Sequence, residues 1–167
     1  MKKSMICILI SFYSGFCFCT YSGMEEPLKI KGFYIGMSKS DVLQVFKKLQ
    51  EDNVAEHISL ESENFRDVIM LDNEFSSTGN KIDIIYDESG KVTGITFQYK
   101  TVNILFDCSK KSAEEFVRSL TTTYDLPEME MKDMGVVKSW KCKSDNLGIQ
   151  ILVDDSKNLR IQKLSAT

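Results

Sequence analysis

The segment at residues 30–49, IKGFYIGMSKSDVLQVFKKL, constrains the fold more than any other part of this chain. Ser38 and Asp41 stand in the pattern of a helix N-cap, in which a hydroxyl and a carboxylate three residues later bond the free amides of the first turn. Apolar residues then recur at spacings of three and four; they are Val42, Leu43, Val45, Phe46 and Leu49. One apolar stripe predicts a helix that packs on another element of the fold.

Residues 1–22 have the layout of a secretory signal peptide, because Lys2 and Lys3 precede an uncharged and largely apolar run at residues 5–23. Small residues permit cleavage after Cys19 or after Ser22. An uncleaved membrane anchor stays open as the alternative, since nineteen uncharged residues are nearly enough to span a bilayer. Residues 23–29 are then a linker, and the expected location is the periplasm or the extracellular medium.

The composition is that of a soluble globular protein, with 43% hydrophobic and 27% charged residues. The net charge is −3, and it becomes −5 without Lys2 and Lys3, when 19 basic residues face 24 acidic ones. Binding to nucleic acid would require a concentration of positive charge. The chain is therefore expected to have no nucleic-acid partner, and to meet a membrane only through its N-terminal segment.

Two cysteines, Cys108 and Cys142, remain after the N-terminal segment. An even pair in an exported protein favours one disulfide. Cys108 precedes the expected helix start at Ser109, and Cys142 lies two residues beyond Trp140, on the same face of an expected strand. Two separate buried thiols are the alternative.

The first half of the chain predicts a helix followed by antiparallel strands. Residues 51–64 are polar and acidic, which suggests a second short helix or an irregular connection. Residues 66–71 form a strand-length apolar run. A hairpin then spans residues 82–99 around Asp87-Glu88-Ser89-Gly90, in which Gly90 is free to take a positive φ.

The second half repeats this plan, with a strand at residues 102–106, a helix from Ser109 to about Tyr124, and strands at 136–142, 147–153 and 159–164. Residues 82–92 and 149–159 are identical or similar at seven of eleven positions, which favours a duplication. The predicted fold is α+β, with two tandem repeats at residues 30–100 and 101–167. Each repeat has one or two N-terminal helices packed on an antiparallel sheet.

The stretch GFYIGMSKSDVLQVF at residues 32–46 resembles the opening signature of small outer-membrane lipoproteins of the BamE/SmpA family. The doubled helix-then-sheet plan is similar to the fold of β-lactamase inhibitory protein. These resemblances imply an exported bacterial protein whose sheet or loops bind another protein. The chain differs from the lipoproteins in lacking a lipobox, since Cys17 and Cys19 each follow a phenylalanine, and in carrying a second repeat.

No nucleotide, nucleophile, metal or cofactor motif is present in the sequence, so no catalytic, metal-binding or cofactor-binding residue is predicted. The acids weighed for catalysis or calcium binding are better explained as turn residues; they are Asp83, Asp87, Glu88, Asp154 and Asp155. His57 is expected to be solvated. A small periplasmic enzyme with an unrecognised carboxylate site is the alternative to a binding protein.

The expected function is therefore binding of another protein through an exposed sheet face and the segment at residues 126–135. Trp140 is one candidate contact, because large aromatic residues are frequent in interface hot spots; packing beneath the sheet is the alternative. The further candidates are Met129, Met131, Met134 and Tyr99. Flexible methionines adapt to partner surfaces, although a plain solvated connection would have the same composition.

Overall fold

The computed structural model of the protein describes residues 26–72 and 79–164. The predicted signal peptide and the first residues of the predicted linker lie outside these ranges. Residues 26–29, within the predicted linker, have no regular secondary structure. Within the described ranges, no helix has the length and apolar character needed to cross a membrane.

Eight strands form one antiparallel sheet in the order β1-β2-β3-β4-β8-β7-β6-β5. The strands are β1 (His57–Ser62), β2 (Arg66–Asp72), β3 (Lys81–Tyr86), β4 (Val92–Phe97), β5 (Glu130–Asp133), β6 (Lys138–Ser144), β7 (Ile149–Asp154) and β8 (Leu159–Lys163). Strands β1 to β4 form one meander and β5 to β8 another. The two meanders join where β4 pairs with β8.

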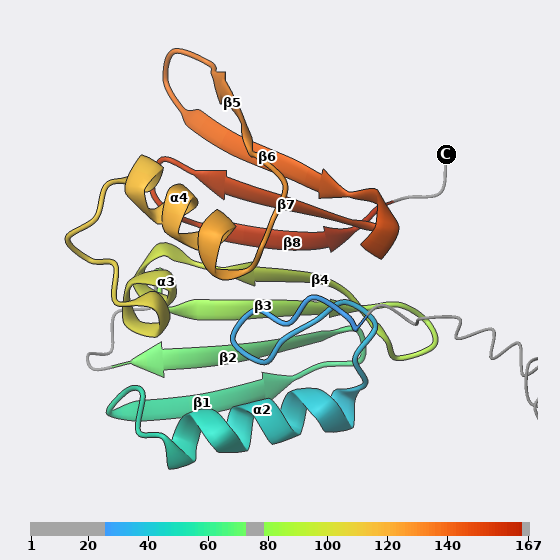
Figure 1. The fold of residues 1–167 in the computed structure, drawn as a ribbon. Helices are drawn as coiled ribbons and strands as arrows, with labels where there is room; N and C mark the ends of the chain where they lie inside the picture. Colours follow the sequence, from blue (N-terminus) through green and yellow to red (C-terminus); the bar gives the residue numbers. More distant parts are fainter. Residues whose placement is uncertain (1–25, 73–78, 165–167) are drawn as a thin grey trace, which may run out of the picture.

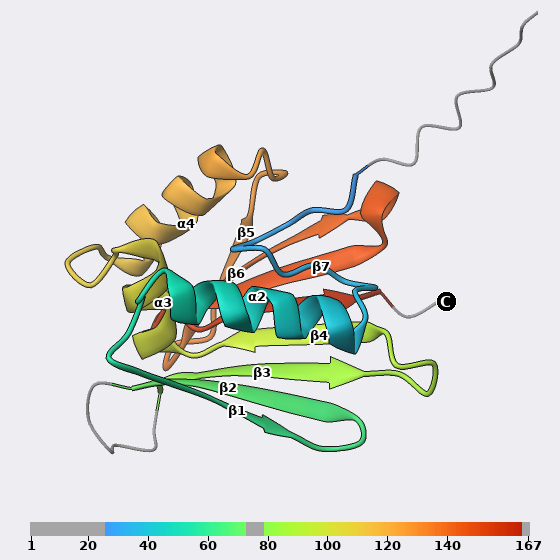
Figure 2. The same ribbon diagram turned by 90° about the horizontal axis from the view of Figure 1, so that it is seen from below.

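All the described α-helices lie on one face of this sheet (Figures 1 and 2). They are α2 (Lys39–Glu51), α3 (Tyr99–Phe106) and α4 (Ala113–Thr123), and the segment before α2 joins them on the same face. The predicted α+β class, with helices on one side of an antiparallel sheet, is confirmed.

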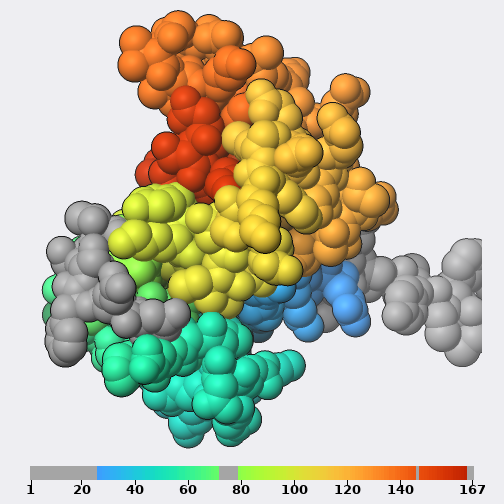
Figure 3. Space-filling view, turned by 90° about the vertical axis from the view of Figure 1, so that its left-hand side faces the viewer, coloured from blue at the N-terminus to red at the C-terminus, as the bar shows by residue number. Residues whose placement is uncertain are grey.

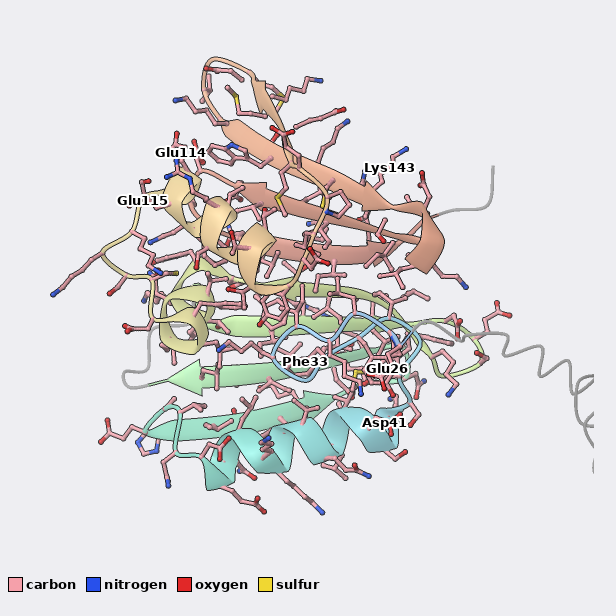
Figure 4. All side chains as sticks on the ribbon, viewed as in Figure 1. Glu26, Phe33, Asp41, Glu114, Glu115 and Lys143 are labelled. Atoms are coloured by element: carbon pink, nitrogen blue, oxygen red, sulfur yellow. The ribbon has the colours of Figure 1, made fainter. Side chains whose placement is uncertain are left out.

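A chain of aromatic rings crosses the core between the helices and the sheet. Phe33, in front of the sheet (Figure 4), meets Phe97 of β4 edge to face, with ring centroids 5.6 Å apart. Phe97 meets Phe106 of α3 at 6.3 Å, and Phe106 meets Phe116 of α4 at 5.4 Å. Because the rings run from the N-terminal segment to α4, both meanders share one core.

The predicted start of α2 is confirmed. The Asp41 amide donates to the Ser38 hydroxyl (3.3 Å), and the Ser38 amide donates to the Asp41 carboxylate (2.8 Å). These bonds from the Ser38 backbone and side chain hold the pKa of Asp41 below its usual value. Val42 and Leu49, from the predicted stripe, are buried.

The predicted strand at residues 102–106 is wrong, because these residues belong to helix α3. Thr101, Val102 and Leu105 are buried at helical spacing, and so short an apolar run does not distinguish a strand from a buried helix. The next helix begins three residues later than predicted, with Ser112 rather than Ser109 as its N-cap. Ser112 has the advantage of Glu115 three residues on, whose carboxylate accepts from the Ser112 amide at 2.8 Å.

Two further segments also differ from expectation. Residues 51–64 contain β1 instead of a second helix, and Ile58 and Leu60 alternate in burial with the exposed residues between them. The segment at residues 126–135, predicted as a connection, contains β5. The predicted repeat boundary between residues 100 and 101 falls inside α3.

The structure has no disulfide between Cys108 and Cys142, and both are free, buried thiols. Cys108 lies beside the β7–β8 turn, where its carbonyl accepts from Lys157 Nζ at 2.9 Å. Cys142 pairs with Ile151 of β7. Ile151 lies three residues before the end of β7, so Cys142 is about 10 Å along the strand from the β7–β8 turn. Burial raises the pKa of both thiols. The alternative of two separate thiols describes this arrangement.

Candidate functional site

The candidate site is the sheet face opposite the helices, here called the open face. Along β6, β7 and β8 the buried side chains alternate with half-buried or exposed ones. The buried set points to the helices, so the residues between them form the open face. No helix or strand of the described ranges covers it (Figure 2).

Cross-strand pairing aligns the open-face residues in two rows. One row runs from β1 to β5 through Glu61, Val68, Asp83, Thr96, Arg160, Leu152, Lys141 and Glu130. The other runs from β2 to β6 through Arg66, Ile85, Gly94, Gln162, Gln150 and Lys143. The site is therefore an extended surface made by the regular register of the sheet.

A concavity of about 710 Å³ lies at the centre of this face, over the junction of the two meanders. Gly94 is on its floor, between Ile85 of β3 and Gln162 of β8. A Cβ atom added at Gly94 would have only Ile85 side-chain atoms within 4 Å, the nearest at 3.8 Å. The glycine thus leaves room on the outer surface, and the hollow is shallow and open.

One wall of the concavity carries a charged pair. Arg66 Nε donates to Asp83 Oδ1 at 3.0 Å, and Arg66 Nη2 contacts the same oxygen. The Asp83 carboxylate raises the pKa of the Arg66 guanidinium. The pairing occupies Asp83, so it presents a fixed polar group rather than a free carboxylate.

The other wall carries one cation, Arg160. Arg160 and Gln162 come from β8, and Gln162 Nε2 donates to Gln150 Oε1 at 3.0 Å. Arg160, Lys141 and Lys143 are exposed, and none forms an ion pair with a described residue. The half of the open face built by β6 and β8 is therefore cationic on a chain whose net charge is −3.

The acids considered for catalysis serve in turns or pairs. Asp87 Oδ1 accepts from the Ser89 and Lys91 amides at 2.9 and 3.0 Å. Asp154 accepts twice from Asn158, and Asp155 accepts from the Lys138 amide. Glu88 and His57 are exposed. Across residues 26–72 and 79–164, no group of three or more His, Cys, Asp or Glu side chains is placed to hold a metal ion.

A buried polar cluster on the helix side of the sheet was not predicted. Tyr86 OH donates to Asp67 Oδ2 at 2.5 Å, and Lys39 Nζ lies 3.7 Å from Asp67 Oδ1 and 5.0 Å from the Tyr86 ring centroid. Burial, together with the bond to Asp67, raises the pKa of Tyr86. The cluster ties β2, β3 and α2 together, and none of the described cavities reaches it.

The predicted partner contacts do not gather in one place. Trp140 is only 6% exposed and packs beneath the sheet on the same face as Cys142, and Met129 is also buried. Met131 and Met134, at 56% and 57%, are exposed on the β5–β6 hairpin. Tyr99 is 38% exposed at the start of α3, and its ring packs over Gly79.

The sequence patterns did not predict the residues that shape the concavity, above all Arg66, Gly94 and Arg160. The available signal was the alternation of polar with apolar residues in residues 92–97 and 159–163. This alternation marks an uncovered face, but it does not say which strands are neighbours. No protein-family model, curated protein or solved structure matches this chain.

Proposed function

We propose that this chain is an exported protein-binding module that uses the open face as its principal contact surface. The observation that carries this proposal is the concavity at the β4–β8 junction, with a glycine floor and polar walls. It is broad and shallow, as a surface for another protein would be, and its one carboxylate is paired.

The apolar content of the open face supports the same proposal. Ile85 is 43% exposed beside Gly94. Leu152 lies between Arg160 and Lys141. Apolar and arginine side chains mixed in this way are typical of protein interfaces.

The partner surface that fits is acidic. Arg160 of β8 and Lys141 and Lys143 of β6 lie on either side of β7, and they have no ionic partners among the described residues. Charge complementarity guides association and sets its specificity. Binding should therefore weaken as salt concentration rises. Export to the periplasm or medium belongs to the proposal and rests on residues 1–22 alone; the intact mass of the protein from the envelope fraction tests it.

We also propose that the fold consists of two tandem copies of one helix-plus-sheet unit. This proposal is supported by the mirrored strand order about β4 and β8, and by residues 82–92 and 149–159, which form the last hairpin of each meander. A capping box opens the helix before each meander. Superposing β1–β4 with α2 on β5–β8 with α4, in an experimentally determined structure, tests the proposal; helices that cannot be overlaid together with the strands would contradict it.

Affinity capture from an envelope extract, with protein recovered from the producing cells as bait, tests the binding function. Three baits are compared with wild type: Gly94→Gln, Arg160→Glu and Lys47→Glu. Gly94→Gln fills the concavity without backbone strain, and Arg160→Glu reverses one wall charge. Lys47→Glu makes the same charge change on the exposed side of α2 and is the control.

We expect one species to be retained by wild type and by Lys47→Glu and to be depleted about tenfold on the two open-face variants, a typical effect of a central interface residue. Equal capture by all four baits would place the binding surface elsewhere. If wild type captures no specific protein, the proposed binding function is wrong.

A further inference from the structure

The two edges of the sheet are protected unequally. The helix α2 covers the edge at β1: Gln50 Nε2 donates to the Ile58 carbonyl of β1 at 3.4 Å, and Lys39 Nζ donates to the carbonyl of Glu63, directly after β1, at 2.6 Å. Strand β5 ends the sheet on the other side, and all four of its residues are exposed. Among residues 26–72 and 79–164, Figure 1 shows no helix or strand beyond β5, and Figure 3 shows the β5–β6 hairpin, in orange, at the end opposite α2.

The β5–β6 hairpin also carries half of the large apolar side chains that are exposed in the described chain. Met131, Met134, Val136 and Val137 lie within seven residues, and Val136 is 92% exposed. An uncovered edge strand beside exposed apolar residues is a template for pairing with another strand.

The turn of the hairpin determines which backbone groups of β5 face outward. The Met134 amide donates to the Val137 carbonyl at 3.1 Å across Gly135, whose φ is +80°. Residues 134 and 137 thus form a hydrogen-bonded pair, and alternation makes the next such pairs Lys132 with Ser139 and Glu130 with Lys141. The amide and carbonyl of Met131 consequently point to the free edge.

The charges on β5 favour one register for antiparallel pairing of β5 with β5 of a second copy. Antiparallel pairing centred on Met131 sets Met131 opposite itself and places Glu130 opposite Lys132 of the other copy, twice. Pairing centred on Lys132 would set two lysines against each other and Met131 against Asp133. Opposite charges across strands stabilise a pair, and like charges destabilise it.

We propose that the protein forms a two-fold symmetric dimer through β5, in the register centred on Met131. In this dimer the two sheets become one, and the two open faces lie on the same side of it. Within each copy, Met131 lies opposite Trp140. In the dimer, the Met131 side chain of each copy also lies beside the Met131 side chain of the other copy, so each covers apolar surface that is exposed in the single chain. This inference goes beyond the proposed function and holds whatever the open face binds.

A charge-exchange experiment tests the dimer with protein recovered from producing cells. In the Lys132→Glu variant, positions 130 and 132 are both glutamate. In the Glu130→Lys variant, both positions are lysine. Each variant alone should dimerise at least tenfold more weakly than wild type, because both cross-strand pairs become repulsive. Mixed together, the two variants should form a heterodimer, since every Glu then faces a Lys.

Sedimentation velocity from micromolar to millimolar concentration measures each association, and circular dichroism verifies the fold of each variant. Lys47→Glu on α2 is the control and should dimerise as wild type does. Wild-type protein that stays monomeric over the whole range would overturn the proposal. A wild-type dimer insensitive to Lys132→Glu, or two variants that fail to associate on mixing, would overturn the β5 register.

Discussion

The two meanders of the sheet have the same strand order, yet they complete their cores in different ways. In the first, α2 runs along the edge strand β1, and a buried carboxylate, Asp67, is held by Tyr86 and Lys39. In the second, α4 lies over β7 instead, the buried position near the edge is Trp140, and no described helix or strand covers β5. The comparison shows that a similar plan can produce one closed edge and one available edge.

Both halves nevertheless depend on the aromatic chain between them, so the largest effect is expected at Phe97. Phe97→Ala removes a fully buried ring that contacts Phe33 and Phe106, and should lower the free energy of unfolding by about 3–5 kcal/mol. Urea unfolding followed by Trp140 fluorescence, which reports on the second meander, should coincide with unfolding followed by far-UV circular dichroism. Two separated transitions in wild type would show that the halves are independent.

A smaller effect is expected at the polar cluster that only the first meander contains. Tyr86→Phe leaves Asp67 Oδ2 without its donor in a buried site, and should cost about 1–3 kcal/mol near neutral pH. Chemical denaturation measures this loss. A change below the error of the measurement would mean that Asp67 is satisfied without Tyr86.

The same variant should alter the alkaline stability profile. The pKa of Tyr86 is raised in the folded protein, so its stabilising contribution is complete below the unfolded pKa of about 10 and falls as pH rises above it. Wild type should therefore lose stability above about pH 10 more steeply than Tyr86→Phe. Parallel curves for the two proteins would contradict the assignment.

The helix caps should make equal contributions in the two halves. Ser38→Ala and Ser112→Ala each remove the acceptor for an N3 amide, and each should cost about 1 kcal/mol. Bonds from the capping serines hold the pKa values of Asp41 and Glu115 below their usual values. Their contribution is thus present above the unfolded pKa values and lost as pH falls through the lower folded ones. Paired thermal melts at neutral and acidic pH measure both effects.

The smallest effect is expected from a reducing agent. Cys108 and Cys142 are free thiols, so dithiothreitol should leave the free energy of unfolding unchanged, whereas reduction of a disulfide typically costs about 2–4 kcal/mol. Peptide mapping after alkylation under denaturing conditions, without reduction, should find both cysteines labelled. A linked peptide containing both residues would show that the pair is bridged.

Local patterns in the sequence were sufficient for part of this fold. Ser38 and Asp41 predicted the start of α2, the Asp87 to Gly90 turn predicted the β3–β4 hairpin, and the apolar spacing in residues 113–120 predicted α4. In each case the signal lies within a few neighbouring residues, because capping, turn formation and amphipathic periodicity are short-range interactions. The α+β class follows from the order of these elements.

Contacts between distant residues decided the rest. Residues 102–106 became a helix because Val102 and Leu105 are buried at helical spacing in the shared core. No local signal separates that outcome from a strand. Cys108 lies beside the β7–β8 turn, away from Cys142 on β6. Gly94 and Arg160 line the same concavity only because β4 pairs with β8. The sequence by itself therefore determined the helices and hairpins that local chemistry specifies, whereas tertiary packing determined the open face, its concavity and the free edge at β5, because strand adjacency depends on the whole core.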